Sequence, residues 1–356
     1  MRRRLVSAFK WAWDNHLSKH KTCRFVLCGS VSSFMVRNVL KSSALYGRVD
    51  LEINVQPLLP VQAMAMLGEG RSMEEIIDIY MVLGGIPQYL LELSPQLSLV
   101  QNLAQMAFRP NGYFTTEYQR LFSSHFGSDH RYERLIAALA DKPVQTLESL
   151  TAGTGLEKGG TFSHLVEDLV IAGFVQRSRP LGQGPATRQS IIRLNDEFLH
   201  FYFSFVKGIG DPSSGHAVDA TALLTGPRFA QWQGYAFERL CIKHAAAIAR
   251  ALGFAGISYR CGPWQATYEN RRVAIDLVFE RADKVVTACE IKYVNSLDGR
   301  TLVDGFARQI EILRILRPRA GIQKVLILGK KIPLPEAAKK YFDTVLYAAD
   351  VFLCLH

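Results

Sequence analysis

Two carboxylates and a lysine interrupt apolar runs near the carboxyl end of the chain. Residues 273–294 read VAIDLVFERADKVVTACEIKYV, two strand-like runs around a polar turn, with Asp276 in the first run and Glu290 and Lys292 in the second. A buried charge without a partner costs several kcal/mol, so these side chains need one another or a ligand. Because side chains two apart on a strand share a face, Glu290 and Lys292 point the same way.

The pairing register decides whether the two carboxylates meet. If the strands are antiparallel and Phe279 faces Thr287, Asp276 lies directly opposite Glu290. Converging carboxylates repel one another at neutral pH unless a cation joins them. Oxygen ligands with retained waters suit Mg²⁺ or Mn²⁺, so the residues predict a site for such a cation between the strands.

The flanking residues predict the elements that hold these side chains. Residues 232–252 have helical periodicity, and Glu238 lies beside the apolar face of that helix. Strand-like residues 256–264 come next, and a helix at 302–316 and a strand at 324–329 follow the two central runs. This order predicts an α/β sandwich with a mixed sheet. The apolar face of the first helix consists of Phe237, Leu240, Cys241 and either His244 or Ala245.

The order of these residues resembles that of the PD-(D/E)XK nuclease fold: Glu238 on a helix is followed by Asp276 and then Glu290-x-Lys292 on successive strands. The resemblance implies that Asp276 and Glu290 are metal ligands and that Glu238 is an outer ligand. It also implies that Lys292 orients the attacking water or stabilises the developing phosphorane charge, and Gln309 on the next helix is a candidate for positioning the substrate. A single E-x-K motif is commonly a solvated strand edge with an ion pair, so a structural role stays open.

Three motifs in the first 90 residues carry a second resemblance, which extends from about residue 22 to about residue 300. They are similar to consecutive motifs of archaeal and bacterial ATPases of the AAA+/STAND type, whose C-terminal part is a nuclease-like domain of the DUF234 kind. That family agrees with the domain expected from the carboxylates. The motifs are FVLCGSVSSFM at 25–35, LYGRVDLEINVQPL at 45–58 and LGGIPQYL at 83–90.

The ATPase resemblance implies nucleotide-proximal positions for three residues. Ser30 would lie near the sensor strand, Arg48 near the phosphates, and Pro87 where the family packs a helical lid near the adenine. The residues themselves predict a buried-type strand at Phe25–Cys28 that runs into a helix start. Taken alone, Ser30 is an ordinary helix cap and Arg48 a solvated surface arginine, and we prefer this interpretation.

The phosphate-binding motif of such ATPases is missing from the sequence. The pattern G-x-x-x-x-G-K-[ST] cradles phosphates with backbone amides. The Gly-Lys pair at 329–330 has Lys324 at the position of the first glycine and Lys331 at that of the hydroxyl residue. We therefore expect a truncated or split ATPase that does not bind ATP by itself, unless a separate chain that bears a P-loop completes it.

The middle of the chain predicts a winged helix-turn-helix. A helix around 147–150, a helix at 160–172 and two strand-like pieces at 174–180 and 189–194 occur in that order. Arginines without intervening acids follow the second helix and could contact a phosphate backbone. Glu167 and Asp168 in the recognition helix do not read bases, so any DNA binding should be weakly specific, and packing against a neighbouring domain stays open. The arginines are Arg177, Arg179, Arg188 and Arg193.

Composition limits the class of protein. The chain has 356 residues and a formal charge of +10, which favours an anionic partner such as DNA. Its six cysteines form no C-x-x-C pair, and no apolar stretch reaches about 18 residues, which points to a reducing cytoplasm and away from a membrane. A homo-oligomer stays open. We expect an ATPase remnant with a lid at 1–125, a winged helix with its connecting helix at 126–206 and a nuclease-like domain at 207–356.

The function that these features predict is metal-dependent hydrolysis of DNA with Mg²⁺ or Mn²⁺ as cofactor. The alternatives are a non-catalytic module for nucleic-acid binding or assembly, and an ATP-binding protein completed by another polypeptide.

Overall fold

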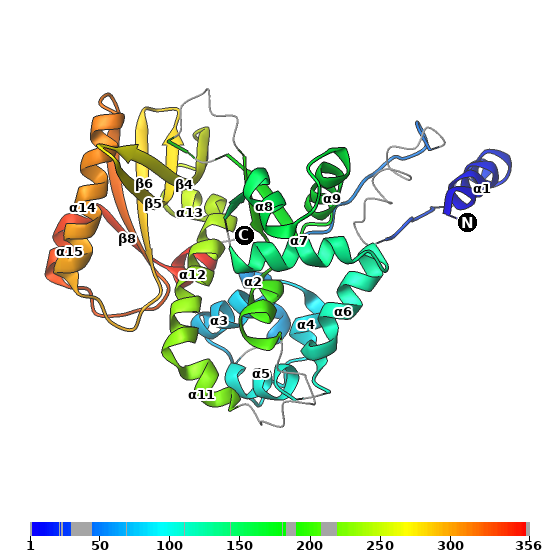
Figure 1. Ribbon diagram of the computed structural model, residues 1–356, viewed down its shortest axis with the longest axis horizontal. Coiled ribbons are helices and arrows are strands. Elements are labelled where there is room, and N and C mark those ends of the chain that lie inside the picture. The colour runs from blue at the N-terminus through cyan, green and yellow to red at the C-terminus, as the bar shows by residue number, and fades with distance from the viewer. Residues whose placement is uncertain are drawn as a thin grey trace. The chain divides into compact units, whose positions relative to one another are not determined.

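The computed structural model describes residues 2–20, 22, 24–29, 45–68, 70–109, 111–142, 144–179, 181–182, 190–207 and 219–353. The chain is a mixed α/β protein that divides into two units (Figure 1). The first unit consists of residues 1–56, 116–178 and 191–199, and the second of residues 57–115, 179–190 and 200–356. This division differs from the predicted boundaries, because the helices of 57–115 group with the C-terminal sheet.

The first unit combines helices with a small antiparallel sheet of order β1-β3-β2. Thr146 caps the N-terminus of α8, and Gly155 ends that helix with a left-handed backbone. The elements are α1 (Arg2–Asn15), η1 (Leu17–Lys19), most of α6 (Tyr113–Phe126), α7 (His130–Asp141), β1 (Gln145–Thr146), α8 (Leu147–Thr154), α9 (Gly160–Ile171), β2 (Val175–Ser178) and β3 (Ile191–Leu194).

The predicted strand at Phe25–Cys28 is wrong. Residues 24–29 form neither strand nor helix, and Phe25 and Val26 are 47% and 77% exposed. A strand needs a hydrogen-bonded neighbour, and none of the described residues supplies one to this segment. The helix start predicted after it falls on residues 30–44, which lie outside the described residues.

The second unit contains the large sheet and the remaining helices. Its helices are α2 (Pro60–Leu67), α3 (Met73–Leu83), α4 (Pro87–Leu91), α5 (Leu99–Ala107), α10 (Glu197–Phe201, which begins in the first unit), the π-helix η3 (Tyr202–Val206), α11 (Ala220–Thr225), α12 (Pro227–Lys243), α13 (Ala245–Ala251), α14 (Gly299–Leu316), α15 (Glu336–Tyr341) and α16 (Ala348–Leu353). Its strands are β4 (Tyr259–Tyr268), β5 (Arg271–Arg281), β6 (Val285–Lys292), β7 (Gly321–Leu328) and β8 (Thr344–Tyr347).

The large sheet has the order β4-β5-β6-β7-β8 and is mixed, as predicted. Strands β4, β5 and β6 are antiparallel, whereas β6, β7 and β8 are parallel. Apolar residues of the sheet pack with Phe306 and Ile310 of α14 in one core, and α12 contacts β5 and β6. Figure 1 shows α14 and α12 on opposite sides of the sheet. Strand β6 is buried along nearly its whole length, because it lies between neighbours and beneath helices.

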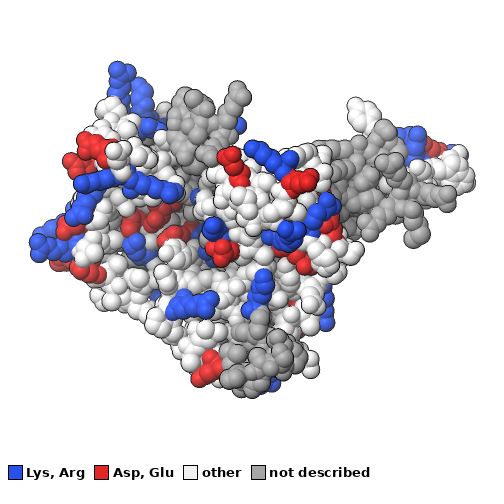
Figure 2. All heavy atoms as spheres, viewed as in Figure 1, with Lys and Arg blue, Asp and Glu red and all other residues white. Residues whose placement is uncertain are grey.

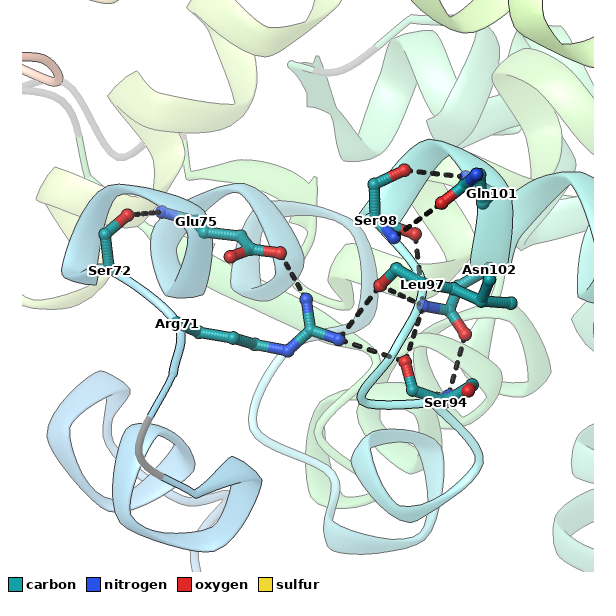
Figure 3. Close-up of polar contacts among 8 residues, drawn as sticks. All are labelled: Arg71, Ser72, Glu75, Ser94, Leu97, Ser98, Gln101 and Asn102. Atoms are coloured by element: carbon teal, nitrogen blue, oxygen red, sulfur yellow. Dashed lines mark hydrogen bonds and ion pairs between the residues drawn. The ribbon is translucent and has the colours of Figure 1, made fainter.

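A polar cluster fixes the loop between α4 and α5. The buried Arg71 guanidinium donates to the carbonyl oxygens of Ser94 and Leu97, each at 3.1 Å, and pairs with Glu75 (Figure 3). Asn102, which is 2% exposed, accepts the Ser94 N–H at 2.8 Å and donates to the same two carbonyls. These side chains satisfy loop groups that would otherwise be buried without partners.

Within the part of the chain that the structure describes, no helix has the length and apolar character needed to cross a membrane. Residues 208–218, at the start of the predicted nuclease-like segment, lie outside the described residues.

Candidate functional site

The register of β5 and β6 agrees with the one that aligns the carboxylates. Phe279 pairs with Thr287, and the ladder runs to Leu277 and Cys289. The next position would place Asp276 opposite Glu290. There the Oδ2 atom of Asp276 accepts the N–H of Ile291 at 2.9 Å, so the carboxylate takes the place of a backbone acceptor at the end of the ladder.

The four predicted catalytic side chains come together at this end of the strands. Lys292 Nζ lies 2.6 Å from Glu290 Oε1, as expected for residues two apart on one strand. Glu238 on α12 lies close enough to experience the charges of Asp276, Glu290 and Lys292. Three elements therefore contribute three carboxyl groups and one ammonium group to a half-buried cluster.

Burial and mutual repulsion change the protonation of these groups. Burial, followed by the nearby charge of Asp276, raises the pKa of Glu238 to about 7. Burial raises the pKa of Asp276, although the Ile291 N–H and Lys292 oppose this shift. Burial and Asp276 also raise the pKa of Glu290. For Lys292, burial favours the neutral amine, but the neighbouring carboxylates outweigh burial and raise its pKa.

The donor set fits a hard divalent cation that keeps several water ligands. The cluster has three carboxyl groups and one amine, and a bound cation would favour the ionised carboxylates, which burial and, for Glu238 and Glu290, the charge of Asp276 disfavour. Among the described residues, no three His, Cys, Asp or Glu side chains are arranged to hold a metal ion by themselves. Asp276 and Glu290 would thus be two protein ligands, and water and substrate oxygens would complete the shell.

One carboxylate near the cluster, Asp78, was not predicted from the sequence. Asp78 of α3 accepts hydrogen bonds from Tyr293, which follows Lys292, and from Gln233 of α12. A carboxylate inside the apolar run of α3 was the available signal, but its partners lie 155 and 215 positions away in sequence. Gln309 of α14, a candidate for substrate positioning, has a buried Oε1 atom without a hydrogen-bond partner.

Of the predicted nucleotide-proximal residues, the structure describes Arg48 and Pro87, which belong to different units. Arg48 belongs to the first unit and forms a two-point ion pair with Asp14 of α1, with bonds of 2.8 and 3.0 Å. That arginine lowers the pKa of Asp14. Pro87 belongs to the second unit and is exposed in the first turn of α4, where its missing N–H costs nothing. Ser30 lies outside the described residues.

Among the predicted phosphate-binding arginines that the structure describes, Arg177 and Arg193 differ in direction and in burial. Gln176 pairs with Arg193 and Arg177 with Ile192, so Arg177 and Arg193 point to opposite faces of the β2–β3 hairpin. Arg177 and Arg179 are exposed, whereas burial lowers the pKa of Arg193 and leaves its Nε without a hydrogen-bond partner. Arg188 lies outside the described residues.

Charge on the visible face is mixed. Figure 2 shows basic and acidic side chains interspersed on the face in view. Asp168 of α9, an expected obstacle to base reading, is buried and accepts the Tyr132 hydroxyl at 2.7 Å. It therefore joins α9 to α7 and is not presented to a ligand.

Comparison with known proteins finds a distant similarity to an archaeal protein. Over 203 residues, or 57% of the chain, the sequence is 25% identical to an uncharacterized protein of Methanocaldococcus jannaschii, and the match covers 45% of that protein. The chain thus spans less than half the length of this relative. No family model matches the chain.

Proposed function

We propose that the second unit hydrolyses DNA phosphodiester bonds with Mg²⁺ or Mn²⁺. The supporting observation is the convergence of Glu238, Asp276, Glu290 and Lys292 at one end of β5 and β6. We propose a PD-(D/E)XK-like fold for residues 207–356. The order of helix α12, strands β4–β7 and helix α14 supports this proposal. We also propose a winged helix for α7–α9 with β1–β3.

Each side chain has a distinct role in this proposal. Asp276 and Glu290 would hold the cation, which when bound lowers the pKa of a water and neutralises charge on the scissile phosphate. Lys292 would orient the nucleophilic water and stabilise negative charge on the phosphate as it forms. Glu238, whose pKa of about 7 lets it exchange protons at neutral pH, would accept a hydrogen bond or a proton from water in the outer shell.

Substitution of the cluster tests the proposal. The full chain should cut linear or branched DNA in Mn²⁺, and Asp276→Asn or Lys292→Ala should reduce the rate at least about 100-fold, because charge at the reacting centre is lost. Asp276→Asn retains the acceptor for the Ile291 N–H, which protects the fold. Gel assays of cleavage, with binding measured separately, give the readout.

A matched control exists on the same strand. Glu280 of β5 forms a 2.7 Å ion pair with Arg317 away from the cluster, so Glu280→Gln should leave cleavage unchanged. Failure of the parent protein to cut DNA with either cation would favour a non-catalytic module for nucleic-acid binding or assembly.

A second candidate function is ATP binding completed by a separate chain that bears a P-loop. The apolar residues Val49, Leu51, Ile53 and Val55 alternate with polar ones, as in a strand with one covered face, yet all four are exposed. Residues 48–56 are in neither a strand nor a helix. A sheet of another polypeptide could cover this segment through strand addition.

Calorimetry distinguishes this candidate from the first. The chain alone should not bind Mg²⁺-ATP in the micromolar range, because it lacks a P-loop lysine and cradle. If a separate chain that bears a P-loop completes the site, the complex of the two chains should bind Mg²⁺-ATP, and Leu51→Lys with Ile53→Lys should abolish that binding. The control Asp50→Asn with Glu52→Gln changes only the alternate face. Micromolar ATP binding by the chain alone would contradict the idea.

A further inference from the structure

A single carboxylate oxygen of α3 contacts α12 and the end of β6, two of the three elements that carry the candidate catalytic side chains. Oδ1 of Asp78 accepts the Tyr293 hydroxyl at 2.6 Å and the Gln233 amide at 2.7 Å. Tyr293 directly follows Lys292 at the end of β6, and Gln233 lies on α12, the helix that carries Glu238. One atom therefore connects α3, α12 and the end of β6.

The Tyr293 ring is held closely on its other sides. Its centroid lies 5.3 Å from that of Phe237 on α12, and Lys330 Nζ lies 4.8 Å above the ring. A Cβ atom at Gly329 would overlap the ring, so the backbone after β7 approaches Tyr293 as closely as only glycine allows. With this packing, the hydroxyl of Tyr293 has a fixed direction, toward Asp78.

A further hydrogen bond attaches α3 to the segment that follows β7. Oε1 of Glu74, one turn before Asp78, accepts the N–H of Lys331 at 2.9 Å, but Glu74 does not contact the two elements of the cluster in the hydrogen bonds described. Glu74 and Asp78 thus both lie on α3 and both accept hydrogen bonds from the second unit, but only Asp78 accepts them from α12 and the end of β6.

We propose that Asp78 is a positioning residue for the cluster: through Tyr293 and Gln233 it fixes the end of β6 and helix α12, and thereby Lys292 and Glu238. This inference rests on the proposed nuclease function for its kinetic consequence. Misplacement of a catalytic group by about 1 Å can reduce a rate about 100-fold, so loss of the contact should reduce kcat more than substrate binding.

Kinetics of Asp78 variants in the full chain test the inference. Asp78→Ala should lower kcat for DNA cleavage in Mn²⁺ at least about tenfold with little change in KM. Asp78→Asn retains an acceptor oxygen at Oδ1 and should restore most of the parent rate. Glu74→Ala is the matched control, and its kcat should remain that of the parent.

A second readout does not require cleavage. Reductive methylation with ¹³C-formaldehyde labels lysines, and a Lys292→Arg variant assigns the Lys292 resonance. Because Lys292 Nζ lies 2.6 Å from Glu290, its chemical shift reports the local geometry. Asp78→Ala should move this resonance and Glu74→Ala should not. If Asp78→Ala does not fold, Tyr293→Phe, which removes the same hydroxyl contact, replaces it in both measurements.

The outcomes separate the two hypotheses. A folded Asp78→Ala protein with an unmoved Lys292 resonance, or with parental kcat, overturns the positioning role. A parent that cuts no DNA with Mg²⁺ or Mn²⁺ overturns the nuclease function, whereas a shifted Lys292 resonance in Asp78→Ala still supports the positioning role.

Discussion

At the scale of single residues, Glu238 has a carboxyl group that titrates near neutral pH in the folded protein. Its pKa of about 7 exceeds its ordinary value of 4.5, first because of burial and then because of Asp276. The folded state therefore holds this proton more tightly than the unfolded chain does. The stability that this group contributes is complete below about pH 4.5 and is lost as the pH rises to about 7.

Glu238→Gln should remove the loss of stability that ionisation of Glu238 causes above about pH 4.5. Because glutamine does not ionise, we expect the variant to exceed the parent in free energy of unfolding by about 1 to 3 kcal/mol at pH 8 and to match it near pH 4.5. Urea unfolding at the two pH values, without divalent cations, provides the measurement. A lower stability of Glu238→Gln at pH 8 would mean that its carboxylate is a net favourable partner of Lys292.

At the scale of elements, the loop between α4 and α5 is held by the amide of Asn102 together with the Arg71 guanidinium. Asn102→Ala leaves the Ser94 N–H and the Ser94 and Leu97 carbonyls without this partner, and should cost about 2 to 4 kcal/mol of unfolding free energy. Gln101→Ala, one residue before, removes only an exposed capping bond to the Ser98 N–H and should cost about 1 kcal/mol or less. Equal losses in thermal or urea unfolding would contradict this explanation.

The elements around the cluster were largely predictable because their periodicity is local. The two strands, the helix after them and β7 were confirmed, as was the register from Phe279 and Thr287. The single helix predicted at 232–252 is helical but is interrupted at His244, so Glu238 lies on α12 and the rest of the segment forms α13. The local apolar pattern predicted a strand wrongly at Phe25–Cys28, because a strand also requires a neighbouring strand, which sequence periodicity does not specify. The local pattern also gave no indication of the role of Asp78, because only the tertiary fold brings its hydrogen-bond partners near.

At the scale of the whole molecule, the charge of +10 favours a polyanion, and two arginines, Arg177 of β2 and Arg179 just after that strand, are exposed. Arg177→Ala with Arg179→Ala should weaken binding of all duplex sequences alike and reduce the slope of log K against log salt by about 2. The double variant Lys339→Ala with Lys340→Ala removes the same charge from α15, and its slope of log K against log salt should remain close to that of the parent. Fluorescence anisotropy over a salt series measures both, and equal slopes in the two variants would argue against arginine contacts.

The exposed alternating segment at 49–55 has a consequence for the behaviour of the chain in solution. An uncovered strand-like sequence, apolar on one face, can pair with its own copies and begin cross-β aggregation. Asp50 and Glu52 on its other face and Pro57 just after it oppose such stacking, since like charges repel and proline cannot donate to a ladder. The chain would then remain dispersed at low concentration and low salt, and would aggregate where salt screens these two carboxylates.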